Sequence, residues 1–371
     1  MRIENPKLLV VIVILIIAAI FVLTPKDNTA LVEKETIVKG MTASQKTGTY
    51  DLAAELQGIS GYINTPQGFK LADVQGKVIL VDFWTFSCIN CIRTQPFLNA
   101  WHEKYADKGL VIVGVHAPEF DFEKELKNVQ AAVTKEGINY PVVLDNDFST
   151  WRAYKNRYWP TKYLIDADGF IRYTHIGEGE YAETEEMIQQ LLKERDEKLQ
   201  LEEKVANEIT DEIGSQDFTQ IGTPELYLGY EFARAPLGNV EGFKPEETVA
   251  YTFPAEADAI EPNLVYLEGD WKNSADYMEL VSETGKVLLY YKAKALNIVA
   301  GNPAAAIIYL DGNPLPPTHY GDAVALENNT PVARINEKTL YNLVSAPDYD
   351  PHLIEFEVQG KGFQLYTFTF G

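Results

Sequence analysis

The apolar positions of the chain form three patterns that follow one another along the sequence. An unbroken apolar run occupies 8–23, short β-branched runs alternate with helical segments over 50–195, and apolar and polar residues alternate with a period of two over 217–371. These patterns are typical of a membrane-spanning helix, an α/β sheet and antiparallel strands, respectively. We therefore predict an N-terminal membrane segment and two folded domains, which 371 residues are enough to form.

The N-terminal run reads LLVVIVILIIAAIFVL and is flanked by Arg2, Lys7 and Lys26. Because a helix rises about 1.5 Å per residue, the run nearly crosses a hydrocarbon core of roughly 30 Å. We predict an uncleaved signal anchor over 1–26, with a cleaved signal peptide as the alternative. In both cases the basic residues before the run keep the N-terminus in the cytoplasm. The predicted location is the cell membrane, with a single pass and an extracytoplasmic catalytic domain, and 27–49 is predicted to be a tether.

The middle of the chain carries alternating strand and helix signals. Strands are predicted over 77–84, 110–115, 140–145, 159–166 and 170–175, and helices after the first strand, over 122–135 and over 149–154. Asp168-Gly169 marks a tight turn, so the last two strands are predicted to form an antiparallel hairpin. Buried strands joined by helices and closed by a hairpin indicate an α/β sheet covered on both faces.

The last part of the chain is predicted to be all β. An acidic stretch follows the α/β region, and we read 196–216 as a charged helical linker. Beyond it, alternating segments such as 286–291, 306–310, 354–358 and 364–370 are separated by Gly, Pro and Asn clusters. Many short strands with turn signals favour a β-sandwich over 217–371, with a jelly roll as the predicted connectivity.

Charge excludes one class of function. The formal net charge is -22 and the isoelectric point is near 4.7. Nucleic-acid binding requires clustered Lys and Arg, so we predict no nucleic-acid partner. The acidic charge is consistent with a soluble extracytoplasmic surface.

The chain contains only two cysteines, which lie close together as Cys88-Ile89-Asn90-Cys91. A structural disulfide framework would join distant positions, and a zinc site would need further ligands, for which the five His show no paired spacing. Redox chemistry remains, with a disulfide between Cys88 and Cys91 in place of a cofactor and with no metal. Since Cys88 follows a predicted buried strand and opens a helix, the helix N-terminus is expected to stabilise its thiolate.

These residues resemble the thioredoxin superfamily signature, in which a buried Asp and a Trp precede the CxxC pair. Asp82 and Trp84 stand in those places, Pro96 matches the helix-kinking proline, and Trp159-Pro160 matches the cis-proline segment. The long stretch between the second Cys and that proline is similar to the TlpA and ResA branch. The string WTFSCINC, together with GVHAPEF over 114–120, resembles the soluble part of DipZ-type proteins.

The resemblance implies roles for individual residues. Cys88 would form the mixed disulfide with a substrate and Cys91 would resolve it, while Asp82 would relay a proton to or from Cys91. The other reading of Asp82 is a hydrogen-bonded strand residue at the sheet edge.

Substrate contacts are implied for Trp84, Trp159, Pro160 and Thr161, with the backbone of a cis-proline loop pairing with an extended segment. Glu119 is a candidate carboxylate near the Cys pair, or else a solvated loop residue.

Two departures from the family pattern limit what can be transferred. Ile89-Asn90 replaces the family's Gly-Pro dipeptide, so the redox potential and the direction of electron flow do not follow from the resemblance. Thr94 stands where the ResA branch tends to carry a Glu near the Cys pair.

The predicted function is that of a membrane-tethered thiol–disulfide oxidoreductase that reduces disulfides in exported proteins. Its partners would be protein thiols and disulfides and a membrane electron donor. One alternative is a peroxiredoxin-type thiol peroxidase, because Thr85-x-x-Cys88 matches the TxxC motif without its preceding proline. The other is a surface binding protein acting through the C-terminal sandwich, which resembles a carbohydrate-binding module. Tyr266 and Trp271 would stack on a sugar in that reading, or else pack in the core.

Overall fold

The computed structural model describes residues 41–201, 208–210, 218–256 and 259–371. The chain divides into two units, 1–42 and 43–371. The predicted signal anchor, most of the predicted tether and most of the predicted linker over 196–216 therefore lie outside the described residues. Among the helices that are described, none is long and apolar enough to span a membrane.

Residues 43–371 contain two domains, called here the first and the second domain. A six-stranded sheet forms the centre of the first domain, with the strand order β1-β4-β3-β2-β5-β6. Its strands are β1 (Gly61–Ile63), β2 (Val78–Trp84), β3 (Leu110–His116), β4 (Val142–Leu144), β5 (Thr161–Ile165) and β6 (Ile171–Ile176). β2 is central: it pairs in parallel with β3 and antiparallel with β5, and all seven of its residues are buried. The predicted α/β sheet and its closing hairpin of β5 and β6 are confirmed.

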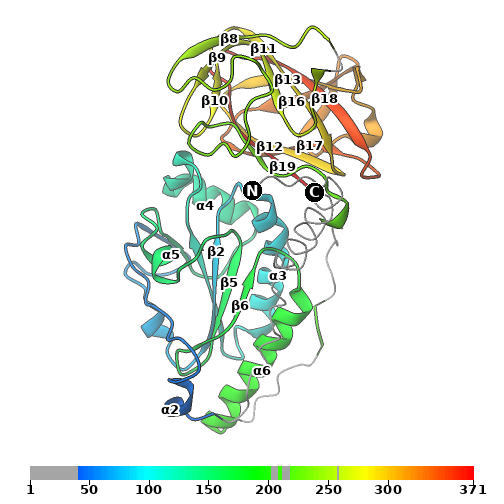
Figure 1. Ribbon diagram of the computed structural model, residues 1–371. Coiled ribbons are helices and arrows are strands. Elements are labelled where there is room, and N and C mark those ends of the chain that lie inside the picture. The colour runs from blue at the N-terminus through cyan, green and yellow to red at the C-terminus, as the bar shows by residue number, and fades with distance from the viewer. Residues whose placement is uncertain (1–40, 202–207, 211–217, 257–258) are drawn as a thin grey trace, which may run out of the picture. The chain divides into compact units, whose positions relative to one another are not determined.

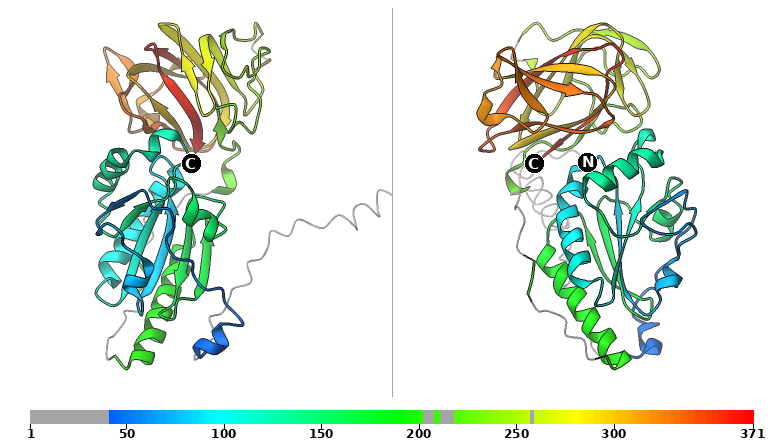
Figure 2. Two further views of the ribbon diagram at one scale, coloured as in Figure 1. Left: turned by 90° about the vertical axis from the view of Figure 1, so that its left-hand side faces the viewer. Right: turned by 180° about the vertical axis from the view of Figure 1, so that it is seen from behind.

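Helices pack along both faces of this sheet. They are α3 (Ile89–Tyr105), α4 (Leu126–Lys135), α5 (Ser149–Ala153) and α6 (Tyr181–Leu199), with short 3-10 turns η1 (Leu71–Val74) and η2 (Asp121–Lys124). α3 and α6 lie side by side along one face, and α5 lies on the other (Figures 1 and 2). The Tyr105 hydroxyl of α3 donates a hydrogen bond to the Glu185 carboxylate of α6 at 2.7 Å, which joins the two helices.

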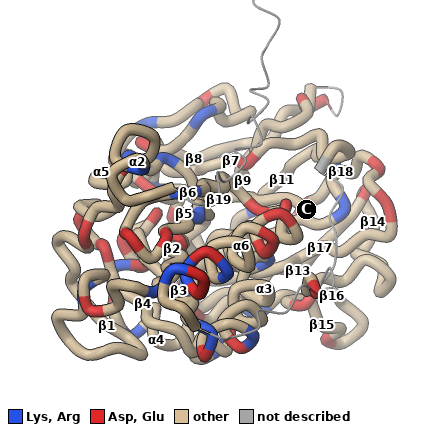
Figure 3. The backbone as a smooth tube through the Cα atoms, turned by 90° about the horizontal axis from the view of Figure 1, so that it is seen from below, with Lys and Arg blue, Asp and Glu red and all other residues tan. Residues whose placement is uncertain are grey.

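The structure differs from the sequence prediction at the start of this domain. Helix α2 (Ala43–Lys46) lies inside the segment predicted as a tether. The Lys46 ammonium is buried and forms ion pairs with Asp166 at 2.8 Å, Asp168 at 3.0 Å and Glu194 at 2.6 Å. The fold therefore begins before the predicted boundary at residue 50. Figure 3 shows acidic and basic positions interspersed over the described chain.

The second domain is built almost entirely from antiparallel strands. They are β7 (Leu226–Tyr227), β8 (Thr248–Tyr251), β9 (Val265–Asn273), β10 (Met278–Leu280), β11 (Thr284–Lys292), β12 (Ala295–Gly301), β13 (Ala304–Leu310), β14 (Asn313–Pro314), β15 (Val324–Glu327), β16 (Thr330–Ile335), β17 (Thr339–Ser345), β18 (Pro351–Gln359) and β19 (Gln364–Phe370). All four strands named from the sequence are present. The domain is a mostly-β barrel or sandwich, and its jelly-roll connectivity stays a prediction.

β9 pairs with strands of two different sheets in this domain, one that contains β11 and one that contains β8 and β10. Residues 265–268 pair with β11, whereas 269–273 pair with β8 and β10. The change occurs at Gly269, whose φ of +107° is accessible to glycine and strained for other residues. The strand can therefore turn from one layer into the other at this position.

Tyr266 and Trp271 of β9 belong to the interior. They are 1% and 0% exposed, so neither can stack on a sugar. The reading of these two residues as core is confirmed, and a carbohydrate platform built on them is wrong.

Candidate active site

The two cysteines lie where β2 passes into α3, as the sequence predicts. Cys88 is the N-cap residue of α3, and its Sγ accepts a hydrogen bond from the backbone N–H of Cys91 at 3.3 Å. Cys88 is partly exposed, whereas Cys91 is 1% exposed. Cys88 is therefore the more accessible of the two thiols, and it lies at the N-terminus of α3.

Cys91 is held in its protonated form. Burial is the main cause that raises the pKa of this thiol well above its usual range, and the neighbouring Cys88 and the charge of Asp82 raise it further. A thiol in this environment needs a nearby group to accept its proton before it can attack a disulfide.

Asp82 lies in the middle of β2, directly opposite Lys162 of β5 and Gly114 of β3. Its side chain is 1% exposed, and neither carboxylate oxygen has a hydrogen-bond partner among the described residues. Burial raises the pKa of Asp82 to about 7, and the positive charge of Lys162 partly opposes the shift. The reading of Asp82 as a hydrogen-bonded residue at the sheet edge is therefore wrong, since β2 is a central strand.

Lys162 is a charged residue of the site that the sequence analysis did not single out. It is fully buried, and its ammonium donates to the carbonyl of Gly177 at 3.2 Å. Burial lowers the pKa of Lys162, while the negative charges of Asp82, Cys91 and Glu178 raise it. The sequence feature that could have identified Lys162 is its place as a lysine within the apolar strand that follows Pro160.

The residues expected to contact substrate do not all reach the surface. The Trp159–Pro160 peptide bond is cis, and Trp159 is half-buried, with its indole N–H donating to the carbonyl of Ala117 at 3.0 Å. Trp84 and Thr161, by contrast, are 1% and 0% exposed because they belong to central strands. The predicted substrate contacts through these two side chains are contradicted.

Tyr158, immediately before the cis-proline pair, was missed by the sequence analysis. It is 55% exposed. Its position beside Trp159 gives the proline loop an exposed aromatic side chain.

A further group of polar residues holds the turn before Cys88. The Thr85 hydroxyl lies 3.3 Å from Nε2 of His116, an imidazole that burial keeps neutral by lowering its pKa to about 3. The Ser87 hydroxyl donates to the carboxylate of Glu123 at 2.5 Å. Both ends of the turn are therefore fixed by β3 and the loop that follows it.

The candidate Glu119 has a different partner from the one expected. Its carboxylate accepts a hydrogen bond from the Tyr227 hydroxyl of β7 at 2.6 Å, and burial raises its pKa to about 8. The carboxylate that lies beside the Cys88 turn is that of Glu123, which is 0% exposed. The sequence reading placed Glu123 in an acidic helical stretch, and nothing in the local pattern marks it as buried.

A thiol that caps a helix, a second thiol buried behind it, an internal carboxyl and a cis-proline segment together define a thioredoxin-like redox site. Comparisons with known proteins agree with this class. Residues 53–174 match the AhpC/TSA family, and 223–371 match the family described as Thioredoxin like C-terminal domain.

Three similar proteins illustrate the relationship. Protein DipZ of Mycobacterium tuberculosis is 33% identical over 323 residues, which are 86% of this chain and 43% of DipZ. Thiol-disulfide oxidoreductase ResA of Bacillus anthracis is 32% identical over 124 residues, which are 33% of this chain and 66% of ResA. A putative thiol:disulfide interchange protein DsbE from Chlorobium tepidum matches over 39% of this chain and 96% of its own, with 26% identity and a TM-score of 0.34.

The chain contains a thioredoxin-like AhpC/TSA domain over 53–174, is homologous to DipZ and ResA, and carries a Thioredoxin like C-terminal domain over 223–371. It spans less than half the length of the DipZ proteins that it matches.

Proposed function

We propose that this chain is a thiol–disulfide oxidoreductase that uses Cys88 and Cys91 to reduce disulfides in exported proteins. The observation that carries the proposal is the unequal exposure of the two thiols at the start of α3. Cys88 is partly exposed and its Sγ faces the helix N-terminus, whereas Cys91 is buried directly behind it. One thiol can therefore meet a substrate while the other is kept for the second step.

The proposed reaction transfers two electrons from the cysteine pair to the substrate. The Cys88 thiolate attacks one sulfur of a substrate disulfide, which forms a mixed disulfide and releases a substrate thiolate that takes up a proton. Cys91 then loses its proton and attacks the sulfur of Cys88. The Cys88–Cys91 disulfide forms, and the second substrate thiol leaves.

Asp82 is the proposed acceptor of the Cys91 proton. Its pKa of about 7 allows it to be ionised before the step and protonated after it, and Lys162 offsets the negative charge in the interior. Trp159 is half-buried and is the proposed substrate-facing residue of the cis-proline segment, whereas Pro160 itself is buried.

The electrons must be restored by another molecule, because the chain has no cysteine beyond this pair. We propose a membrane electron donor, consistent with the apolar run over 8–23. In this proposal 1–26 anchors the chain, 50–195 carries the chemistry outside the membrane, and 217–371 is a docking module.

Extraction of membranes at alkaline pH tests the anchor, since an anchored chain stays in the pellet and a peripheral chain is released.

Insulin reduction driven by dithiothreitol tests the chemistry. Cys88→Ser is expected to lose activity completely. Cys91→Ser is expected to accumulate a mixed disulfide with the substrate, visible on a non-reducing gel. Full insulin-reducing activity in Cys88→Ser would refute the proposed function.

The equilibrium potential of the pair determines the direction of electron flow. A value near that of thioredoxin, about -270 mV, supports a reductase, whereas a value near about -120 mV supports a disulfide donor.

Thiol peroxidase activity is a second candidate, favoured by the match of 53–174 to the AhpC/TSA family. Consumption of hydrogen peroxide with dithiothreitol as reductant separates the two functions. Peroxide turnover that exceeds insulin reduction and depends on Cys88 would replace the oxidoreductase assignment.

A further inference from the structure

Glu123 is a buried carboxylate that the chemistry above does not use. It accepts hydrogen bonds from three donors: the Ser87 hydroxyl and the backbone N–H groups of Glu119 and Phe120. An internal carboxylate is costly unless its oxygens are satisfied, and three donors converge on this one. Since Ser87 immediately precedes Cys88, the position of the reactive thiol depends on a side chain that follows β3.

The same loop is held on its other side by the C-terminal domain. The Tyr227 hydroxyl lies between two carboxylates, at 2.6 Å from Glu119 and 3.3 Å from Glu225. The guanidinium of Arg234 lies over the Tyr227 ring at 4.9 Å. Tyr227 belongs to β7, which pairs with the last strand of the chain, so its position is set by the sheet of the C-terminal domain.

Aromatic rings follow the same path as these hydrogen bonds. Phe86, in the turn before Cys88, packs edge-on against Phe122 at 5.8 Å between ring centroids. Phe122 and Phe120 each lie 5.0 Å from the ring of Tyr366 in β19. Apolar contacts therefore run from the active-site turn into the C-terminal sheet without a break.

A second contact reaches the residues between the two cysteines. The Arg93 guanidinium donates to the side-chain oxygen of Asn90 at 2.9 Å and to the carboxylate of Glu178 at 2.8 Å. The backbone of Gly371 lies against it, because a Cβ at that position would come within 2.5 Å of the guanidinium. The C-terminal domain thus touches the cysteine helix as well as the loop that follows β3.

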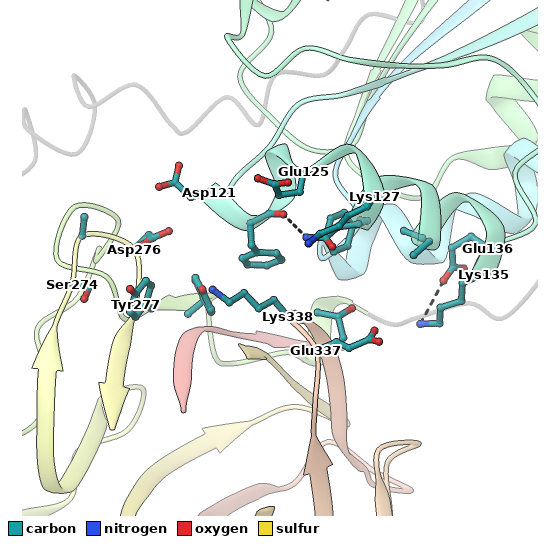
Figure 4. Close-up of a pocket in the computed structure, with 18 of the residues that line it drawn as sticks. Asp121, Glu125, Lys127, Lys135, Glu136, Ser274, Asp276, Tyr277, Glu337 and Lys338 are labelled. Atoms are coloured by element: carbon teal, nitrogen blue, oxygen red, sulfur yellow. Dashed lines mark hydrogen bonds and ion pairs between the residues drawn. The ribbon is translucent and has the colours of Figure 1, made fainter. Parts of the chain in front are cut away.

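A cleft of about 1200 Å³ lies beside these contacts. Figure 4 shows Asp121, Glu125 and Lys127 on the side of the first domain, facing Asp276 and Lys338 on the side of the second. Its walls also include Phe86, Phe122 and Tyr366, so the aromatic path borders the cleft.

We propose that the C-terminal domain completes the active site, with Tyr227, Glu119 and Glu123 acting as positioning residues that hold Ser87 and so orient Cys88. The proposal rests on the thiol chemistry proposed above. It deepens that function by giving the C-terminal domain a part in the reactivity of the thiol.

The test measures the reactivity of Cys88 in the full chain. In a Cys91→Ser background only Cys88 can be alkylated, so the rate with iodoacetamide at pH 7 reports on this thiol alone. Tyr227→Phe removes one hydroxyl, and Ser87→Ala removes the group that Glu123 holds. Tyr251→Phe is the matched control, because this Tyr of the same domain is 1% exposed and its hydroxyl also donates to two acceptors, Gly242 and Asn273.

Tyr227→Phe and Ser87→Ala are each expected to slow alkylation about fivefold, the scale of losing one buried hydrogen bond. With Cys91 restored, the potential of the pair is expected to become about 20 mV more negative, since a tenfold change in equilibrium corresponds to roughly 30 mV. Tyr251→Phe is expected to leave both quantities at the parent value.

Parent rates in folded Tyr227→Phe and Ser87→Ala would overturn the proposal, as would equal slowing by Tyr251→Phe. Glu123→Gln is a second variant: it keeps the shape but presents an NH₂ group to backbone donors, and it is expected to slow alkylation at least as much as Ser87→Ala. If the native chain fails to reduce insulin although Cys88 is alkylated rapidly, the proposed function fails and the positioning role stands. If it reduces insulin and the variants match it in alkylation, only the positioning role fails.

Discussion

Replacing Asp82 with Asn is expected to change how the stability of the protein depends on pH. Burial raises the pKa of this carboxyl from 3.8 to about 7. Below pH 3.8 the group is protonated in both the folded and the unfolded chain. Between the two pKa values the unfolded chain loses the proton that the folded chain keeps, so stability falls as pH rises.

The size of this loss follows from the shift. One pKa unit corresponds to about 1.4 kcal/mol, so the free energy of unfolding should fall by roughly 4 kcal/mol between about pH 4 and pH 7 and change little above. Asn does not ionise and escapes this loss. The stability of Asp82→Asn relative to the native chain is therefore expected to rise by about 1.4 kcal/mol per pH unit within that window.

Guanidinium denaturation of the reduced chain at half-unit steps from pH 4.5 to 8.5 measures this difference. Tryptophan fluorescence reports mainly on the first domain, which holds four of the five Trp in the chain. Asp107→Asn, at an exposed position of the same domain, controls for the loss of an acidic side chain. A difference between Asp82→Asn and the native chain that stays flat across the window would refute the assignment of Asp82 as a carboxyl titrating near pH 7.

Three further predictions concern single side chains. Lys162→Met removes the positive charge that opposes the shift of Asp82, so the pKa of Asp82 should move further above its usual range and the same denaturation series should reach its plateau at higher pH. Lys46→Met leaves Asp166 with one cation fewer in a buried cluster and is expected to destabilise the first domain by about 3 kcal/mol in guanidinium; a loss below about 1 kcal/mol would contradict it. Trp271→Ala leaves a cavity in the second domain and is expected to cost about 4 kcal/mol, measured by calorimetry, and an unchanged melting transition would refute its place in the core.

The elements around the cysteines could be predicted because their signals are local. The apolar residues of β2, the cysteine pair and the helical spacing that follows lie within one short stretch of sequence. β1 was missed because three residues are too few to show a period. Helix α2 was missed because the ion pair that fixes Lys46 joins it to a residue 120 positions away.

The charged residues of the site were harder to find for a different reason. Lysine and glutamate are rarely buried, so the sequence alone favours placing Lys162 and Glu123 in solvent. Both are fully buried in the structure because their partners come from elsewhere in the fold: Asp82 stands across the sheet from Lys162, and Ser87 donates to Glu123. These partners are brought together only by the folded chain, through the pairing of β2 with β5 for Lys162 and through the loop after β3 for Glu123.

In the proposed mechanism the two thiols depend on different carboxyl groups. Asp82 acts on Cys91 from within the central strand of the first domain, and its electrostatic environment comes from β2 and β5. Glu123 acts near Cys88 from the loop that Tyr227 holds. Because the two groups reach the pair through separate elements, the step that needs the Cys91 proton should follow pH through Asp82 whatever the C-terminal domain contributes, whereas the first attack by Cys88 should respond to Tyr227.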